Sequence, residues 1–273
     1  MCELLGMSFN EPVRPNISVK GFRKKSERNP DGWGVAYYPD ESVQVIKEPL
    51  EAGESFLSEF IRNYNEISTE IFIMHVRKSS IGSVSHKNTH PFVRELNGKE
   101  YVFAHNGSLK EFSRLITGRF KPVGQTDSEH VFCYILNQIE SRKILHWNAE
   151  HFLWLSRLLV EINSYGKFNC IFSDGEYLFC YNDVNDFKDF CLVKRKAPYE
   201  NIRLLDDEVE VDLFVEKQPS QYGYIMATNP LTNESWESYL PGELKVFKKG
   251  EIIFSNLLKE TMILQSTNLE GEE

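Results

Sequence analysis

The strongest constraint on the fold is a succession of short strand-like segments interrupted by helices that come in a group. Asp174-Gly175 lies between two of these segments and is a strong signal for a two-residue hairpin. Grouped helices between runs of strands predict an α+β layered fold. A doubly wound sheet is disfavoured, because no strand–glycine-loop–helix unit carries the dinucleotide fingerprint. The segments that read as strands are Gly34–Tyr38, Val43–Ile46, Glu70–Val76, Tyr101–His105, Cys170–Ser173, Tyr177–Tyr181 and Tyr222–Ala227.

Three segments repeat apolar residues at helical spacing. The repeat is clear in Asp127–Ser141 and Ala149–Ser164 and weaker in Glu54–Asn65. The chain has 273 residues, of which 41% are hydrophobic, so it can bury a sizeable core. We expect one domain over residues 1–273, with a polar tail from about residue 266.

The charge balance excludes some partners. With 31 basic and 40 acidic residues the net charge is −9, which argues against nucleic-acid and membrane partners. The basic cluster Arg23, Lys24, Lys25 and Arg28 is too short for a nucleic-acid surface and reads as a solvated loop. No apolar run reaches the length of a membrane span, and the first residues do not resemble a signal peptide.

The cysteines indicate a reducing compartment. There are five of them, an odd number, and no two form a CxxC pair. This is not a disulfide framework. The sequence therefore predicts a cytoplasmic enzyme or binding protein.

Cys2 is the first candidate for chemistry. Removal of Met1 would place a thiol and a free α-amino group on the same residue. An α-amino group has a pKa of about 8, so near neutral pH part of it is an unprotonated base. It could take the thiol proton and make Cys2 a nucleophile that carries its own base. The alternative, which its position alone favours, is an ordinary second residue of an opening strand.

Asn106-Gly107 is the second candidate. The run Phe103–Gly107 looks like an apolar strand that ends in a turn. The Asn106 side-chain amide and the Gly107 backbone N–H are two neighbouring donors, as an oxyanion hole requires. An ordinary Asn-Gly hairpin turn is the alternative.

Asp127 and Arg77 are candidates for holding a substrate. Thr126 and Glu129 fit a capping box, which places Asp127 in the first turn of a helix, where the dipole favours its ionised form. Asp127 could hold an α-ammonium group, and Arg77 could grip an α-carboxylate with its bidentate fork. The alternatives are a helix-start acid without a ligand and a surface arginine at a strand end.

Three histidines raise the question of a metal site. His75, His90 and His105 together with Cys2 match no compact metal motif, so we predict no metal. His75 and His105 end apolar strands and are interpreted as structural.

Six elements in order resemble the class II glutamine amidotransferases of the N-terminal nucleophile hydrolase superfamily. They are Cys2, Asp31-Gly32-Trp33-Gly34, His75-Val76-Arg77, Thr89-His90-Pro91-Phe92, His105-Asn106-Gly107 and Thr126-Asp127-Ser128-Glu129. Two later segments resemble the stand-alone branch of that family. They are Asn169–Gly175 and Ala227-Thr228-Asn229-Pro230-Leu231, which Trp236 follows.

The resemblance implies a four-layer αββα sandwich and a role for each matching residue. Cys2 would be the nucleophile, with Asn106 and Gly107 as the oxyanion hole. Arg77 would bind the α-carboxylate of glutamine and Asp127 its α-ammonium group. His90 matches a histidine near the glutamine pocket. No cofactor is implied.

Two positions depart from the family pattern. Lys78 and Ile81 stand where the synthetase-type branch usually has Trp and His, which leaves open how the glutamine lid closes. No part of the chain is long enough for a synthase domain, so either ammonia released from glutamine passes to a separate partner protein, or the enzyme is simply a hydrolase of γ-glutamyl amides. The alternatives are a hydrolase of γ-glutamyl compounds, such as glutathione-like peptides, and a catalytically silent γ-glutamyl-binding protein.

Overall fold

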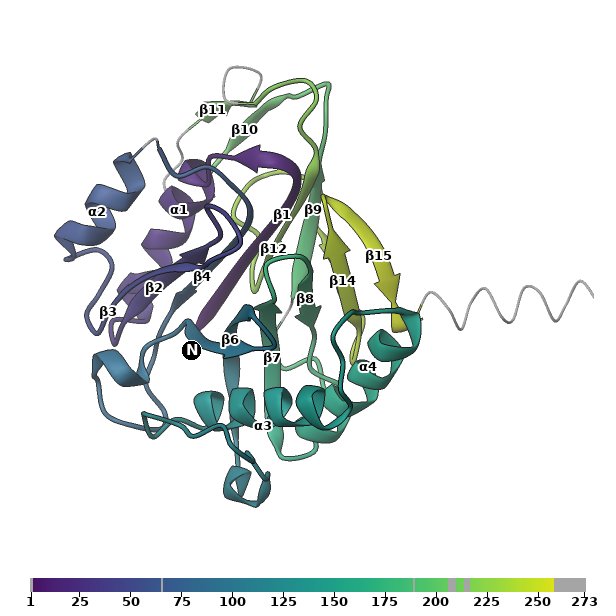
Figure 1. The fold of residues 1–273 in the computed structure, drawn as a ribbon. Coiled ribbons are helices and arrows are strands. Elements are labelled where there is room, and N and C mark those ends of the chain that lie inside the picture. The colour runs from purple at the N-terminus through teal and green to yellow at the C-terminus, as the bar shows by residue number, and fades with distance from the viewer. Residues whose placement is uncertain (1, 65, 189, 206–209, 214–216, 258–273) are drawn as a thin grey trace, which may run out of the picture.

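Two large antiparallel sheets face each other in the computed structural model, which describes residues 2–64, 66–188, 190–205, 210–213 and 217–257 (Figure 1). The seven-stranded sheet has the order β13 (Glu237–Ser238), β9 (Cys191–Arg195), β12 (Gly223–Ala227), β1 (Glu3–Val13), β4 (Thr69–Val76), β2 (Trp33–Tyr37) and β3 (Gln44–Glu48). The six-stranded sheet has the order β15 (Glu251–Ser255), β14 (Leu244–Lys248), β8 (Leu178–Tyr181), β7 (Gly166–Ser173), β6 (Lys99–Leu109) and β5 (Phe92–Leu96). A small separate ribbon pairs β10 (Asn201–Arg203) with β11 (Glu210–Asp212).

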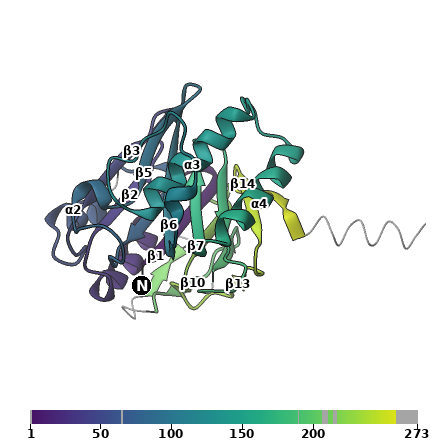
Figure 2. The ribbon, with the colours of Figure 1, turned by 90° about the horizontal axis from the view of Figure 1, so that it is seen from below.

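Apolar side chains fill three layers between four layers of secondary structure. Leu4 and Ile73 of one sheet pack with Val102 and Ile171 of the other. Helices α1 (Asn16–Arg23) and α2 (Phe56–Asn63) cover the outer face of the seven-stranded sheet. Helices α3 (Asp127–Ser141) and α4 (Ala149–Asn163) cover the other sheet (Figures 1 and 2). This is the αββα sandwich, and the expected fold class is confirmed.

Strand β1 is the structural centre of the seven-stranded sheet. It pairs with β12 on one side and β4 on the other, and its first seven residues are buried. In this register Glu3 lies opposite Val76, the last residue of β4. The residue before β1 and the residues after β4 are therefore neighbours. These are Cys2 and the segment that begins with Arg77.

The helices predicted from apolar spacing are present. α3 has the predicted bounds, α4 ends one residue earlier, and α2 is a shorter form of the weaker candidate. The basic cluster is not a loop, because α1 extends to Arg23 and a 3₁₀ helix spans Lys24–Arg28 with Ser26 buried inside it. The predicted polar tail lies outside the described residues.

The Asp174-Gly175 hairpin lies where expected, but its connection has four residues, because β7 ends at Ser173 and β8 begins at Leu178. The Asp174 carboxylate explains the longer turn, since it accepts hydrogen bonds from the backbone N–H of Glu176 and of Tyr177, at 3.1 and 2.9 Å.

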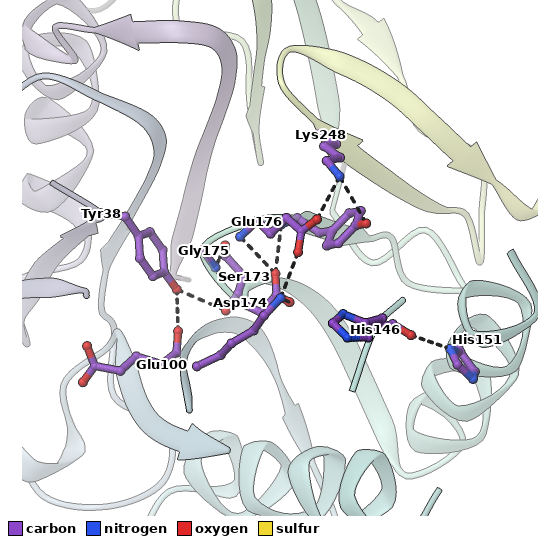
Figure 3. A network of polar contacts seen from close by, with 11 residues as sticks. Tyr38, Glu100, His146, His151, Ser173, Asp174, Gly175, Glu176 and Lys248 are labelled. Atoms are coloured by element: carbon purple, nitrogen blue, oxygen red, sulfur yellow. Dashed lines mark hydrogen bonds and ion pairs between the residues drawn. The ribbon is translucent and has the colours of Figure 1, made fainter. Parts of the chain in front are cut away.

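Nearby, the Tyr38 hydroxyl donates to the carbonyl oxygens of Glu100 and Ser173, at 2.8 and 3.2 Å (Figure 3). Tyr38 follows β2, so these bonds tie the two sheets together.

Candidate active site

Cys2 opens onto a large cavity at the start of β1. The cavity has a volume of about 1040 Å³, and Cys2, Asn106 and Gly107 form part of its wall. The Cys2 Sγ atom lies 3.2 Å from the backbone nitrogen of Lys78 and 3.3 Å from its carbonyl oxygen. The thiol can therefore donate to the carbonyl, and a thiolate would accept from the N–H.

The surroundings of Cys2 favour the neutral thiol at rest. Burial raises the pKa of the Cys2 thiol above its ordinary value. The Lys78 backbone N–H and the charges of Arg77 and Lys188 oppose this effect without cancelling it. A thiol with a raised pKa needs a base at the moment of attack.

Asn106 and Gly107 lie in the middle of a ladder and not in a turn. β6 continues to Leu109 and pairs with β7 throughout, so the predicted turn after His105 is wrong. The reason is that β7 extends back to Gly166 and supplies hydrogen-bond partners that a turn would have lacked. Gly107 is required by close approach, because a Cβ there would lie 1.9 Å from the Lys167 carbonyl oxygen.

The side chain of Asn106 reaches from one sheet to Cys2 at the start of the other. Its Nδ2 donates to the Cys2 carbonyl oxygen at 2.6 Å. This bond fixes the side-chain amide beside Cys2, where it has a second N–H to offer. The two predicted oxyanion donors and the predicted nucleophile thus meet at one cavity wall.

Arg77 is buried, with 2% of its surface exposed, and not a surface arginine. Its guanidinium donates to the carbonyl oxygens of Ile81, Gly82 and Ser83 at 3.1 to 3.3 Å. Its backbone exchanges hydrogen bonds with Asp31 and Gly32. The chain that follows β4 therefore wraps around the Arg77 side chain.

Asp127 begins α3, as predicted, and is buried. Its Oδ2 accepts from the Leu109 backbone N–H at 2.7 Å, and its charge acts on Arg77. Only half of the predicted capping box is present. Thr126 accepts from the Glu129 N–H, whereas the Glu129 carboxylate binds the N–H groups before the helix and pairs with Arg94.

The three histidines form a buried group. The rings of His75 and His90 lie with their centroids 4.1 Å apart and their planes tilted by 36°, and neither ring nitrogen of His90 has a hydrogen-bond partner. His105 lies near Ser128 Oγ, at 2.8 Å, and the Lys167 carbonyl, at 3.2 Å. Burial and neighbouring charges lower the pKa of His75 to about 3 and that of His90 well below its ordinary value.

Sequence reasoning missed an ionic anchor behind Cys2. The Lys188 ammonium donates to the Cys2 carbonyl oxygen at 3.1 Å and pairs with Glu3. The other oxygen of Glu3 accepts from Thr228 and Asn229. Thr228 and Asn229 belong to a segment that carries the family resemblance, but no spacing in the sequence links Glu3 to Lys188, because 185 positions separate them.

The structure thus separates the predicted residues into two groups. Cys2, Asn106 and Gly107 line the cavity, whereas Arg77, Asp127 and His90 are buried and do not belong to its lining. Among the described residues no cluster of three or more His, Cys, Asp or Glu has the arrangement of a metal site. None of the described helices is long and apolar enough to cross a membrane.

The family model described as glutamine amidotransferases class-II matches residues 1–270. The chain belongs to this family. This class II glutamine amidotransferase resembles YafJ of Escherichia coli, which is provisionally named a glutamine amidotransferase. The two sequences are 36% identical over 257 residues. That match covers 92% of this chain and 99% of YafJ. An uncharacterised protein of Methanocaldococcus jannaschii, MJ1515, is 51% identical over 94% of this chain and 72% of its own length.

Solved structures of other amidotransferases share the fold. A crystal structure of a predicted glutamine amidotransferase from Pseudomonas aeruginosa superposes with a TM-score of 0.70 at 30% identity, over 93% of this chain and 100% of that one. Glutamine phosphoribosylpyrophosphate amidotransferase from B. subtilis gives a TM-score of 0.64 at 15% identity. That match covers 93% of this chain and 49% of the larger enzyme, and shows the fold alone.

Proposed function

We propose that this class II glutamine amidotransferase hydrolyses the γ-amide of glutamine with Cys2 as N-terminal nucleophile. The observation that carries the proposal is the meeting of the Cys2 thiol with the Asn106 amide and Gly107 at one cavity wall. These groups come from two different sheets. Their convergence supplies a nucleophile and two adjacent hydrogen-bond donors.

In the proposed mechanism Met1 is removed first. The α-amino group of Cys2 then takes the thiol proton, which the raised pKa of that thiol makes necessary. The thiolate attacks the γ-carbonyl carbon, and the negative oxygen receives hydrogen bonds from Asn106 and Gly107. The C–N bond breaks, ammonia leaves with the proton, and a γ-glutamyl thioester remains. Water hydrolyses this thioester to glutamate and restores the thiol.

Arg77 and Asp127 would hold the amino-acid end of the substrate. Arg77 now donates to neutral carbonyl oxygens of residues 81–83. A substrate carboxylate would accept stronger, charge-assisted bonds from the same guanidinium. Glutamine binding would therefore replace these loop contacts. Asp127 lies in the electrostatic reach of Arg77 and supplies the opposite charge for an α-ammonium group.

A γ-glutamyl compound larger than glutamine is the second candidate substrate. The observation that favours it is the cavity volume of about 1040 Å³. Pockets that enclose drug-sized ligands measure roughly 300 to 1,000 Å³. Free glutamine would leave most of this space to water.

The test compares three forms of the protein. Cys2→Ala should abolish ammonia release from glutamine, and a short extension before Cys2 should do the same, because it turns the α-amino base into an amide. A protease site placed so that cleavage releases Cys2 is the matched control, and cleavage should restore activity. Full activity in the Cys2→Ala protein would refute the mechanism.

A labelling experiment separates the enzyme from a silent binding protein. A glutamine-mimicking electrophile should label the trimmed protein once, at Cys2, as peptide mass spectrometry would show. Binding of glutamine without labelling and without turnover would support the silent protein instead.

A further inference from the structure

The cavity beyond Cys2 carries an excess of positive charge. Four of its lining residues are charged, namely Lys78, Lys110, Lys167 and Asp183. The Asp183 carboxylate already accepts from the N–H groups of Phe168 and Asn185 and from the Asn163 side chain, at 2.7 to 2.8 Å. It is fully buried and serves the fold. The three lysines therefore set the charge that a ligand meets.

These lysines differ from the lysines of this chain that are held in ion pairs. Within the described ranges none of the three has an ion-pair partner, whereas Lys99, Lys194, Lys248 and Lys249 pair with carboxylates. The whole protein has a net charge of −9. Three uncompensated ammonium groups around one cavity create a local positive potential that attracts anions.

The cavity also offers apolar surface beside the lysines. Val160 of α4 is 42% exposed, and Val184 and Phe187 belong to the loop after β8. The Lys167 ammonium lies 4.2 Å from the centre of the Phe187 ring. A ligand here can place a short carbon skeleton on apolar side chains and a negative group on the lysines.

The position of the cavity assigns it to one side of the scissile bond. It reaches Cys2, Asn106 and Gly107 but not Arg77 or Asp127. With the amino-acid end of the substrate at Arg77 and Asp127 and the γ-carbonyl at Cys2, the nitrogen that leaves points into the cavity. The lysines then face the part of the substrate that leaves with the nitrogen, and they can bind a negative group on that part.

We propose that the substrate is a γ-glutamyl amide whose leaving amine carries a carboxylate or a phosphate, which Lys110, Lys167 and Lys78 bind. This inference rests on the proposed function. Thiolate attack breaks the γ-glutamyl C–N bond, the amine leaves with the thiol proton, and water releases glutamate from the thioester. No oxidant or further reactant is needed.

The test compares substrates that differ mainly in charge. γ-Glutamylglycine has a carboxylate that γ-glutamylglycinamide lacks, and the γ-glutamyl amide of phosphoethanolamine carries a phosphate. We expect kcat/KM for each anionic amide to exceed that of the glycinamide by at least about threefold at low salt, since exposed ion pairs contribute modestly. The larger of the two ratios identifies the preferred anion. Both ratios should fall in about 0.5 M salt.

Variants connect the preference to the lysines. Lys110→Gln and Lys167→Gln should each lower the ratio roughly 1.5- to 5-fold. The ratio is measured within one protein, so a general loss of folding or of activity cancels. Lys121→Gln is the matched control, because Lys121 is an exposed lysine that does not line the cavity. It should keep the wild-type ratio.

Two failures are distinguishable. Suppose that glutamine and all three γ-glutamyl amides are hydrolysed through Cys2, and that kcat/KM for each anionic amide is close to that of the glycinamide. The proposed function then stands and the lysine inference is wrong. If no γ-glutamyl compound is hydrolysed and Cys2 is not labelled, the proposed function fails, and the inference with it.

Discussion

The buried His75–His90 pair makes the free energy of unfolding depend on pH, at pH values above those at which carboxyl groups titrate. His75 is fully buried, and its pKa of about 3 lies well below the value of about 6.5 for an unfolded chain. Between these values the unfolded chain binds a proton that the folded protein excludes. The contribution of His75 is therefore fully present above about pH 6.5 and is lost as the pH falls toward 3.

The perturbation is His75→Leu, which removes the titrating group. Each such histidine costs about 1.4 kcal/mol per pH unit once the unfolded form is protonated. Between pH 7 and pH 5 the wild-type protein should thus lose about 2 kcal/mol more unfolding free energy than the variant. The variant can be less stable at pH 7, because its side chain fits differently, yet its pH dependence should be flatter.

The assay is urea denaturation at half-unit steps from pH 5 to pH 7. This window lies above the ordinary carboxyl pKa of about 4, so few carboxyl groups titrate in it. Ile73→Val is the control, since it lowers stability in the same strand without removing a titrating group. If the free energy of unfolding changes with pH by the same amount in the wild-type and His75→Leu proteins, His75 is not a neutral buried imidazole.

Two further predictions concern strand β6. Asn106→Ala should lower kcat for γ-glutamyl hydrolysis about 10²- to 10³-fold with a smaller change in KM, measured at steady state, and an unchanged kcat would remove Asn106 from the mechanism. Gly107→Ala should destabilise the fold by about 2–4 kcal/mol in denaturation, because its Cβ would lie 1.9 Å from the Lys167 carbonyl oxygen and push β6 from β7. The control Gly98→Ala meets no atom within 4 Å and should cost only about 1 kcal/mol for its positive φ of 78°.

The helices that line one face of a sheet were the most predictable elements. α4 buries one stripe and exposes another, so its sequence carries a clear 3.6-residue period. β1 carries no such signal, because a strand buried on both faces has no alternation to detect. The position of Asn106 in a strand was hidden for a different reason. Asn-Gly favours a turn locally, and only the pairing with β7 overrides that preference.

Single residues of the site were predictable where a short local motif marks them in the sequence. Cys2, Asn106 and Gly107 do meet, but their meeting depends on the packing of two sheets, which spacing alone does not encode. The burial of Arg77 was not predictable either, because the loop of residues 79–83 that covers it has no regular pattern. Lys110 and Lys167 gave no signal at all. Only their position in the same cavity indicates that they could bind a ligand together.

The Tyr38 hydroxyl ties the two sheets together at some distance from Cys2. It holds Glu100 and Ser173 of the other sheet, and it follows Tyr37, which lies opposite Phe72 on β4. Cys2 precedes Glu3, which lies opposite Val76 on the same strand. Continued by one residue, these registers place Tyr38 level with Ile71 and Cys2 level with Arg77, so at about 3.3 Å per residue the two lie roughly 20 Å apart along the sheet. The Asn106 side chain ties the same two sheets together at Cys2. With the sandwich pinned at both places, the position of Cys2 relative to Asn106 is set by the fold before any substrate binds.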